Sequence, residues 1–328
     1  MSEDNSVRDS RLKDSRLKAR AVYFTGPGRV DVREEDLEGD TGVLVRSRLI
    51  AISHGTESLF YKGPFPSGQE GEQLNTSAGN DYPIKYGYMN LGQLEDDRRV
   101  FAFYPHQDVF LANPDDLMQV PDHIRDEDAV LYPSVETAFQ IVHDAAPLLA
   151  ERAIVFGLGM IGQLVCRLLI MAGCDVIGVD PAESRRLRAT ATGVRALDPG
   201  ELSVISDADL AINTSAHAAA LQAAIDVLAP EARVIEASWY GARPVTISLG
   251  AAFHRKRLHI RSSQVSHLGP SQRPRWNRVR RNQAVWKLMD SVRPGDLVSH
   301  RIPLNEAARA YELIAAEEAD LMQILLVP

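Results

Sequence analysis

Three glycines and one aspartate have the spacing of a turn that binds a dinucleotide. Gly157, Gly159 and Gly162 form the pattern Gly-x-Gly-x-x-Gly, and Asp180 follows eighteen residues after the last of them. In such a turn the first glycine allows a tight bend, the second lets the backbone approach a pyrophosphate, and the third lets helix and strand pack closely. This chemistry requires a strand before the turn and a helix after it.

The flanking residues predict that strand and that helix. An apolar run at 153–156 enters the turn, apolar residues at helical spacing follow over 164–171, and a second apolar run at 176–179 ends at Asp180. This alternation is typical of a Rossmann unit, in which the helix amides and dipole face the diphosphate. The alternative is an ordinary α/β turn without ligand, because glycines also serve such turns. The predicted cofactor contacts are Thr137, Gly157, Gly159, Met160, Ile161, Gly162, Asp180, Arg185, Thr214 and Ser238.

The acidic residue at the end of the second run bears on which cofactor binds. The Asp180 carboxylate can accept hydrogen bonds from the adenosine ribose hydroxyls and would repel a 2′-phosphate, which favours NAD over NADP. Arg185 and Arg186 follow closely. Two arginines there either flank the adenine or accommodate the phosphate, so NADP remains the alternative.

Length and composition limit the kinds of protein this chain can be. With 328 residues we expect two domains. A net charge of −8 argues against a nucleic-acid surface, and no apolar run is long enough to span a membrane. The N-terminal residues lack the apolar segment of a secretory signal. The only cysteines, Cys166 and Cys174, form no CxxC pair, which suits a reducing cytoplasm.

The order of elements predicts an α/β fold with two domains. Alternating residues over 19–32 and 42–52 indicate strands, the Gly- and Pro-rich residues 64–82 a surface loop, and residues 126–142 a helix. Further apolar strands at 210–212, 234–237 and 258–260 predict a doubly wound parallel sheet covered on both faces. The last stretch is expected to be helical at 278–292 and 305–317 and extended at 300–302 and 323–327. We expect a flexible tail over 1–18, a β-rich catalytic domain over 19–137 and 269–328, and a Rossmann domain over 138–268.

Four separated segments carry a resemblance to a known family. They are GTE at 55–57, GYMNLG at 87–92, VETAFQIV at 135–142 and the closing residues 305–328. In this order they resemble the medium-chain dehydrogenase/reductase superfamily. A closer resemblance, to its bacteriochlorophyllide hydroxyethyl dehydrogenase-like branch, is carried by ISHGTE at 52–57, SWYG at 238–241 and SSQV at 262–265. The resemblance implies a GroES-like catalytic domain beside the Rossmann domain, an alcohol dehydrogenase-like activity and a homodimer.

The chain departs from the zinc-containing members at their metal ligands. His54 stands where they place a cysteine, Tyr88 and Met89 stand where they place His-Glu, and Pro133 stands where they place a further cysteine. Zinc requires about four N, S or O donors, counting a bound water at a catalytic site, which methionine and proline cannot supply here. We therefore expect no metal, with an unusual site of His54, Glu57 and His106 as the alternative.

Without zinc, the oxygen that reacts during hydride transfer needs donors from the protein. The resemblance places His54, Thr56 and Tyr88 around that oxygen, in the cleft between the domains. Thr56 matches the hydroxyl that hydrogen-bonds the reacting oxygen, and either His54 or Tyr88 is the acid–base group. The alternatives are that His54 only caps a turn and that Tyr88 only fills the space left by zinc. The predicted substrate pocket adds Glu57, as an orienting group, with Tyr61, Lys85, Tyr104, His106 and Trp239.

The arginines of 273–281 form a basic cluster. It is either a solvated helix face or a site for an anionic substrate.

The whole sequence predicts a zinc-independent, NAD-dependent alcohol dehydrogenase or ketone reductase acting on a polyol, sugar or ring-bearing metabolite. The alternatives are an NADPH-dependent enone or quinone reductase and a non-catalytic NAD-binding sensor.

Overall fold

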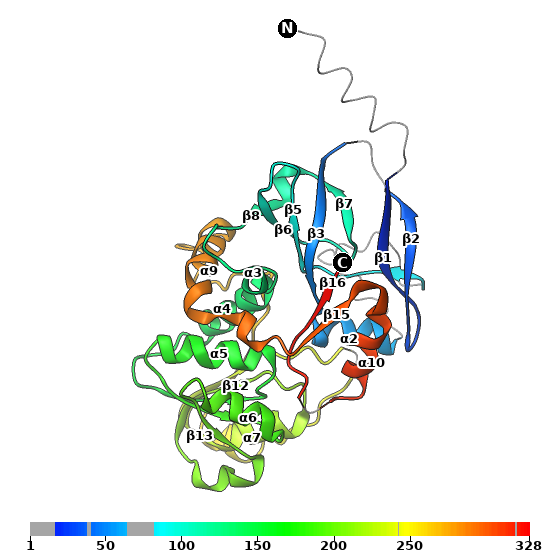
Figure 1. The fold of residues 1–328 in the computed structure, drawn as a ribbon. Coiled ribbons are helices and arrows are strands. Elements are labelled where there is room, and N and C mark those ends of the chain that lie inside the picture. The colour runs from blue at the N-terminus through cyan, green and yellow to red at the C-terminus, as the bar shows by residue number, and fades with distance from the viewer. Residues whose placement is uncertain (1–16, 38–40, 64–81, 242, 319) are drawn as a thin grey trace, which may run out of the picture. The chain divides into compact units, whose positions relative to one another are not determined.

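The computed structural model describes residues 17–37, 41–63, 82–241, 243–318 and 320–328. Contacts divide the chain into two compact units (Figure 1). The first unit comprises Met1–Val130, His300–Ala316 and Ile324–Pro328, and the second comprises Leu131–Ser299 and Glu317–Gln323. The predicted tail and the predicted loop at 64–82 lie almost wholly outside the described residues.

The first unit is built on two sheets, which are antiparallel except where β15 and β16 pair in parallel. The small sheet has the order β2-β1-β4, from β1 (Lys18–Gly26), β2 (Arg29–Asp36) and β4 (Ile84–Lys85). The larger sheet has the order β15-β16-β3-β5-β6-β8, and β7 also pairs with β3. Its strands are β3 (Val43–Ala51), β5 (Asn90–Gln93), β6 (Arg99–Ala102), β7 (Val109–Ala112), β8 (Leu117–Gln119), β15 (His300–Pro303) and β16 (Ile324–Val327).

Two helices of the first unit contact each other although they lie far apart in the sequence. Helix α2 (His54–Lys62) follows β3, and α10 (Ala307–Ala315) follows the 3-10 turn η4 (Leu304–Glu306). In Figure 1 the red α10 lies beside the pale blue α2, and residues of the two helices are in contact. This contact brings the end of the chain to the segment 53–57.

The second unit contains one fully parallel sheet of order β11-β10-β9-β12-β13-β14. The strands are β9 (Arg152–Phe156), β10 (Asp175–Val179), β11 (Arg195–Leu197), β12 (Ala208–Asn213), β13 (Leu228–Glu236) and β14 (His259–Ser262). The helices are α4 (Tyr132–Ala145), α5 (Met160–Met171), α6 (Glu183–Thr190), α7 (Ala218–Asp226), α8 (Ala252–Arg255) and α9 (Arg278–Val292). The strand order reverses between β9 and β12, so the predicted doubly wound sheet is confirmed.

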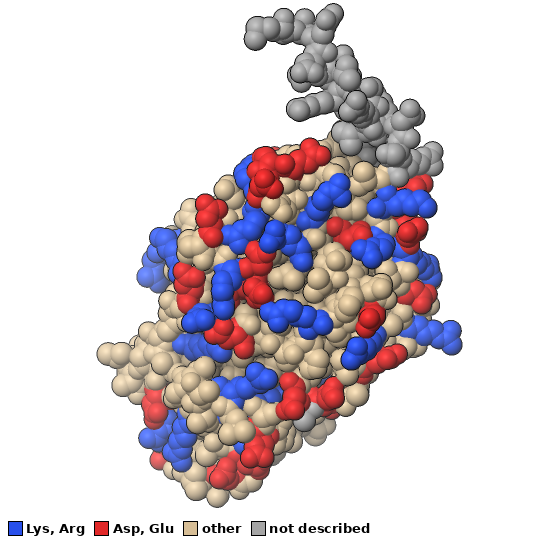
Figure 2. Space-filling view, viewed as in Figure 1, with Lys and Arg blue, Asp and Glu red and all other residues tan. Residues whose placement is uncertain are grey.

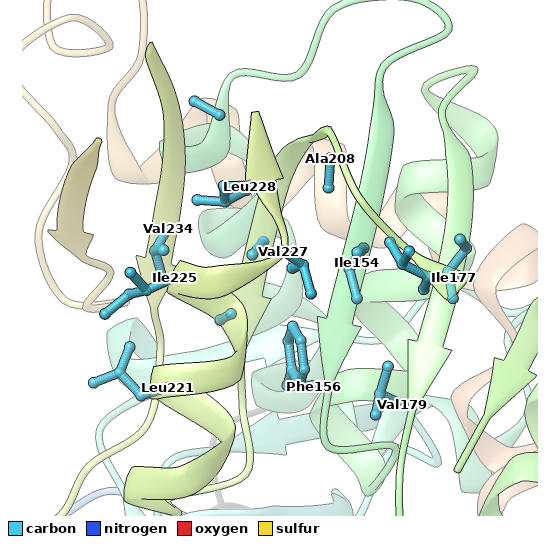
Figure 3. Packing of buried hydrophobic residues seen from close by; sticks show 14 of the residues in the cluster. Ile154, Phe156, Ile177, Val179, Ala208, Leu221, Ile225, Val227, Leu228 and Val234 are labelled. Carbon is cyan, nitrogen blue, oxygen red and sulfur yellow. The ribbon is translucent and has the colours of Figure 1, made fainter. Parts of the chain in front are cut away.

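The core of the parallel sheet explains why the apolar runs form strands. Ile154 and Phe156 of β9 point to the same side as Val234 of β13, because alternate residues of a strand share a face (Figure 3). Leu221 and Ile225 of α7 pack on that face. Burial of these side chains removes apolar area from water, which stabilises the sheet.

The structure corrects two predicted elements. Residues 126–142 form two helices, α3 (Asp126–Ala129) and α4, because the chain leaves helical hydrogen bonding before Pro133, which occupies the first turn of α4 and has no amide to donate. Residues 305–317 begin as the 3-10 turn η4 before α10 starts. Helix α2 had no predicted secondary structure; Glu57 in its first turn and Lys62 in its last suit the helix dipole.

Helix α9 packs within the second unit, whereas the predicted boundary at residue 268 places 269–328 with the β-rich domain. Trp286 of α9 lies 4.8 Å from the ring of Tyr132 of α4, and Arg281 forms a 2.8 Å ion pair with Glu136. Aromatic packing and a buried ion pair therefore hold this helix on α4.

Among the residues that the structure describes, no helix has the length and apolar character needed to cross a membrane. Figure 2 shows basic and acidic side chains interspersed over the visible face. Over the whole chain acidic residues outnumber basic ones, which gives the net charge of −8.

Candidate active site

The three glycines of the turn each meet a different steric demand. Gly157 has φ +90°, a conformation that favours glycine. A Cβ on Gly162 would lie 1.8 Å from the carbonyl oxygen of Gly157, so only glycine lets α5 approach the turn this closely. A Cβ on Gly159 would meet no atom of the described residues within 4 Å. The turn is thus packed on its inner side and open at Gly159, immediately before the first amides of α5 at Met160 and Ile161.

Asp180 links the second strand of the unit to this turn. It follows β10 and is 2% exposed; its Oδ2 accepts a 2.8 Å hydrogen bond from the Leu158 amide, and its Oδ1 accepts one of 2.8 Å from the Ala182 amide. A carboxylate has about four acceptor sites, so both oxygens can still accept from ribose hydroxyls. Asp180 therefore fixes the turn and has capacity left for a ligand.

The two arginines after Asp180 have different environments. Arg186 donates to the Asp180 and Pro181 carbonyls and to the Asp198 carboxylate, so it is used within the unit. Arg185 places Nη1 3.7 Å from Asp180 Oδ2, and its buried Nε has no hydrogen-bond partner among the residues that the structure describes. Arg185 is therefore the basic group available to a ligand beside Asp180.

Other predicted cofactor residues hold the loops at the carboxyl ends of the strands. The Thr214 hydroxyl donates to the Gly157 carbonyl at 2.9 Å, and Ser238 Oγ accepts from the Ala216 amide at 2.9 Å. Thr137 is half-buried in α4. Thr214 and Ser238 thus position the loops that border the glycine turn.

In the first unit, Tyr88 and Thr56 are brought together. The Tyr88 hydroxyl is within hydrogen-bonding reach of the Ser53 and Thr56 side chains. Burial, aided by the nearby charge of Glu57, raises the pKa of Tyr88 to about 12, although those two hydrogen bonds oppose the shift. The phenol therefore keeps its proton at neutral pH, which disfavours the suggestion that Tyr88 is a base.

Glu57 is the centre of a buried hydrogen-bond network. Its Oε1 accepts from the Ser53 amide at 2.7 Å, and its Oε2 contacts His106 Nε2 at 2.9 Å and accepts from the Tyr311 hydroxyl at 2.6 Å. The side chains of Glu57, His106 and Tyr311 are fully buried. Burial and the charge of Glu57 raise the pKa of Tyr311 well above its usual value. Glu57 therefore holds the start of α2 through the Ser53 amide and is itself buried.

His106 differs from its predicted place in the substrate pocket. It is 0% exposed and lies against Gly87, where a Cβ would come within 2.3 Å of Nδ1. Gly87 has φ +133°, so glycine provides both the conformation and the space for the imidazole. His106 is consequently an interior partner of Glu57.

The remaining predicted pocket residues have contacts within their own units or are exposed. Lys85 forms an ion pair with Glu35 in the small sheet, and the Tyr104 ring stacks at 3.9 Å on Phe110. The half-buried Tyr61 stacks at 5.8 Å on Tyr311. Trp239 follows β13 and is 42% exposed. His54 is half-buried at the first position of α2.

The side chains of the alternative metal site are engaged in other contacts. Across the described ranges, no three His, Cys, Asp or Glu side chains gather as a metal site. Of the alternative triplet, Glu57 and His106 bind each other, and Glu57 also accepts a hydrogen bond from Tyr311. Met89 is buried and apolar where a ligand would be needed.

The arginine cluster has contacts within the protein. Arg281 pairs with Glu136, and Arg280 lies 4.1 Å from the ring centroid of Trp276. Arg273 donates to the Leu268 carbonyl. These contacts hold the 268–281 segment together, which favours a structural role for these three arginines.

Sequence reasoning missed three residues. Tyr311 gave no local signal, because its partner Glu57 lies 254 residues earlier. Asn213 and Glu236 were detectable, since each is a polar residue that ends an apolar strand of the parallel sheet. Such strand ends face ligands in doubly wound folds.

The comparisons with known proteins agree with this geometry. No family model matches the chain. Over 282 residues it is 28% identical to D-guloside 3-dehydrogenase of Escherichia coli K12, covering 75% of this chain and 81% of that relative. A structure described as a short chain alcohol dehydrogenase from Escherichia coli CFT073 with NADH superposes with TM-score 0.75 at 16% identity, covering 95% of this chain and 99% of the other.

A second solved structure, a putative zinc-binding dehydrogenase from Sinorhizobium meliloti 1021 bound to NADP, gives TM-score 0.74 at 16% identity, with 95% and 100% coverage. At these identities the likeness establishes the fold. The chain has the α/β architecture of these solved dehydrogenases, with a Rossmann unit and a β-rich GroES-like unit.

Proposed function

We propose that this protein is a zinc-independent, NAD(H)-dependent oxidoreductase that interconverts a secondary alcohol and a ketone. The observation that carries the proposal is the glycine turn closed by Asp180, because the carboxylate and the open space at Gly159 suit a dinucleotide. Similarity to D-guloside 3-dehydrogenase supports a sugar, polyol or other ring-bearing metabolite as substrate. A place in the zinc-lacking branch and a homodimeric assembly remain predictions.

The second unit would hold the cofactor through its backbone. The amides of Met160 and Ile161, at the start of α5, would bind the diphosphate, and Asp180 would accept from the adenosine ribose. When bound, the nicotinamide ring accepts or donates the hydride.

The first unit would supply the groups around the reacting oxygen. Thr56 and Tyr88 can donate hydrogen bonds to it, and Tyr88 does so as a neutral phenol because its pKa is raised to about 12. His54, at the start of the same helix as Thr56, would exchange the proton, since histidine does so near neutral pH. The Glu57 network keeps this helix start in place.

The experiment that tests the proposal is cofactor titration followed by a substrate screen. Dissociation constants for NAD(H) and NADP(H) should favour NAD(H), and a panel of secondary alcohols and keto-sugars should yield turnover with it. Tight NAD(H) binding without turnover of any member would point instead to a sensor.

An NADPH-linked reductase is the second candidate, and one observation favours it. Within the described part of the chain the buried Nε of Arg185 has no hydrogen-bond partner, and the guanidinium lies beside Asp180, where a 2′-phosphate would need a cation. A preference for NADP(H) in the same titration would select this candidate over the first.

A further inference from the structure

A polar cluster joins the carboxyl ends of β12 and β13. Glu236, the last residue of β13, is paired in register with Asn213, the last residue of β12. Glu236 Oε2 accepts from Asn213 Nδ2 at 2.8 Å and from the Tyr240 hydroxyl at 3.1 Å, and its Oε1 accepts from the Ser238 amide at 2.8 Å. Asn213 is fully buried and holds the following loop through Ser215. The carboxylate therefore has a fixed position at the edge of the sheet.

This carboxylate has no positive partner in the described parts of the chain. Glu136 and Glu151 of the same unit form ion pairs with Arg281 and Arg233 at 2.8 and 2.7 Å. Glu236 is half-buried and receives only neutral donors. Burial and the charge of Glu236 raise the pKa of the neighbouring Tyr240 to about 12. A half-buried charge of this kind favours a cation nearby.

The sheet order indicates which part of a dinucleotide would approach it. The glycine turn follows β9, and Asp180 follows β10 on one side, whereas β12 and β13 lie on the other side. A dinucleotide crosses the sheet at the point where the strand order reverses. With the adenosine at Asp180, the nicotinamide half extends over the ends of β12 and β13, where Glu236 is.

We propose that Glu236 is the counter-charge of the oxidised nicotinamide ring, so that it lowers the dissociation constant of NAD⁺ relative to that of NADH. The ring carries a positive charge in NAD⁺ and none in NADH, while the rest of the two molecules is identical. This inference rests on the proposed function, because it requires a dinucleotide at the glycine turn.

The test compares the two cofactor forms in the wild-type protein, in Glu236→Gln and in Glu231→Gln. Glu231 lies on the same strand near its other end, where it pairs with Arg257 at 2.6 Å, so its variant removes the same charge far from the turn. NAD⁺ binding is measured by calorimetry and NADH binding by its fluorescence. Glu236→Gln should raise the NAD⁺/NADH ratio of dissociation constants about fivefold or more, because two opposite unit charges about 4 Å apart attract by about 1 kcal/mol in bulk water and more strongly near a protein surface. Glu231→Gln should leave the ratio unchanged.

Three outcomes separate the possibilities. An unchanged ratio in Glu236→Gln, or an equal loss for both forms, overturns the inference and leaves Glu236 as a loop support. Absence of binding of either form to the wild-type protein overturns the proposed function as well. Should Glu236→Gln fail to fold, the wild-type protein still decides: added salt must weaken NAD⁺ more than NADH, because screening acts on the extra charge, and equal salt dependence contradicts the inference.

Discussion

The hydroxyl of Tyr311 donates a 2.6 Å hydrogen bond to the carboxylate of Glu57, across 254 residues of sequence. Both side chains are fully buried, and the same carboxylate oxygen contacts His106. This bond fixes the first turn of α2, which carries Thr56, against α10.

Replacing Tyr311 with phenylalanine should destabilise the protein by about 1–3 kcal/mol, because Glu57 loses a donor without access to water. Chemical denaturation of the full-length protein, followed by circular dichroism, measures the change. Tyr61→Phe is the matched control, since Tyr61 stacks on the same ring but is only half-buried. Both substitutions keep the ring, so equal effects would show that the hydrogen bond to Glu57 adds no stability.

The glycine turn offers a pair of substitutions with opposite expected signatures. Gly162→Ala places a Cβ 1.8 Å from a backbone oxygen and should lower stability by about 1–3 kcal/mol or more. Gly159→Ala meets no atom of the protein, so stability should hold while NAD(H) affinity falls about tenfold or more, because the side chain occupies the place of the pyrophosphate. Thermal unfolding and cofactor titration distinguish them. Unchanged affinity in Gly159→Ala would place the diphosphate elsewhere.

Asp180 and Arg185 should have separable effects on cofactor choice. Asp180→Ala should weaken NAD by about 1–3 kcal/mol, since a charged acceptor for the ribose is lost. Arg185→Ala should leave NAD binding nearly unchanged and reduce any residual NADP binding, because the guanidinium is the cation beside the ribose site. Titration of both variants with both cofactors checks this. Loss of NAD binding in Arg185→Ala alone would contradict the assignment.

The pH dependence should identify the acid–base group. Tyr88 holds its proton up to a pKa of about 12, so a break in kcat near neutral pH belongs to another group, and we expect His54. His54→Ala should lower kcat by about 10²–10⁴ and remove the break. Tyr88→Phe should lower kcat and retain the break, with NAD affinity close to wild type in both variants. A neutral break that persists in His54→Ala would sink the role of His54.

Chelation tests the expectation that no zinc takes part. Purified protein should contain no stoichiometric zinc, and a strong chelator should leave turnover intact, because Met89 and Pro133 offer no ligands. Elemental analysis and activity before and after chelation measure this. About one zinc per chain, lost together with activity, would refute it.

The Rossmann unit was predictable because its signals are local. Strand, glycine turn, helix and Asp180 are consecutive, and each glycine answers a demand set within a few residues. The break between α3 and α4 was less apparent, since apolar residues continue across it and only Pro133 marks the new start. The roles of His54, Thr56 and Tyr88 at the substrate remain predictions.

The surroundings of Glu57 could not be read from the sequence. Its carboxylate, His106 and Tyr311 come from three distant segments, and their meeting depends on the packing of both sheets and both helices. Lys85 and Tyr104 likewise looked like pocket groups, but an ion pair with Glu35 and stacking on Phe110 involve them elsewhere. Long-range pairing decides such cases, and residue type alone does not.

The bond between Tyr311 and Glu57 also has a consequence for biosynthesis. A ribosome adds roughly 5–20 residues per second, so Tyr311 is made roughly 10–50 seconds after Glu57. Throughout that interval the nascent chain holds a carboxylate whose phenolic donor does not yet exist, and β3 lacks its neighbour β16. The segment with Thr56 can thus reach its final form only after translation has passed residue 311, whereas every strand of the parallel sheet has by then been synthesised.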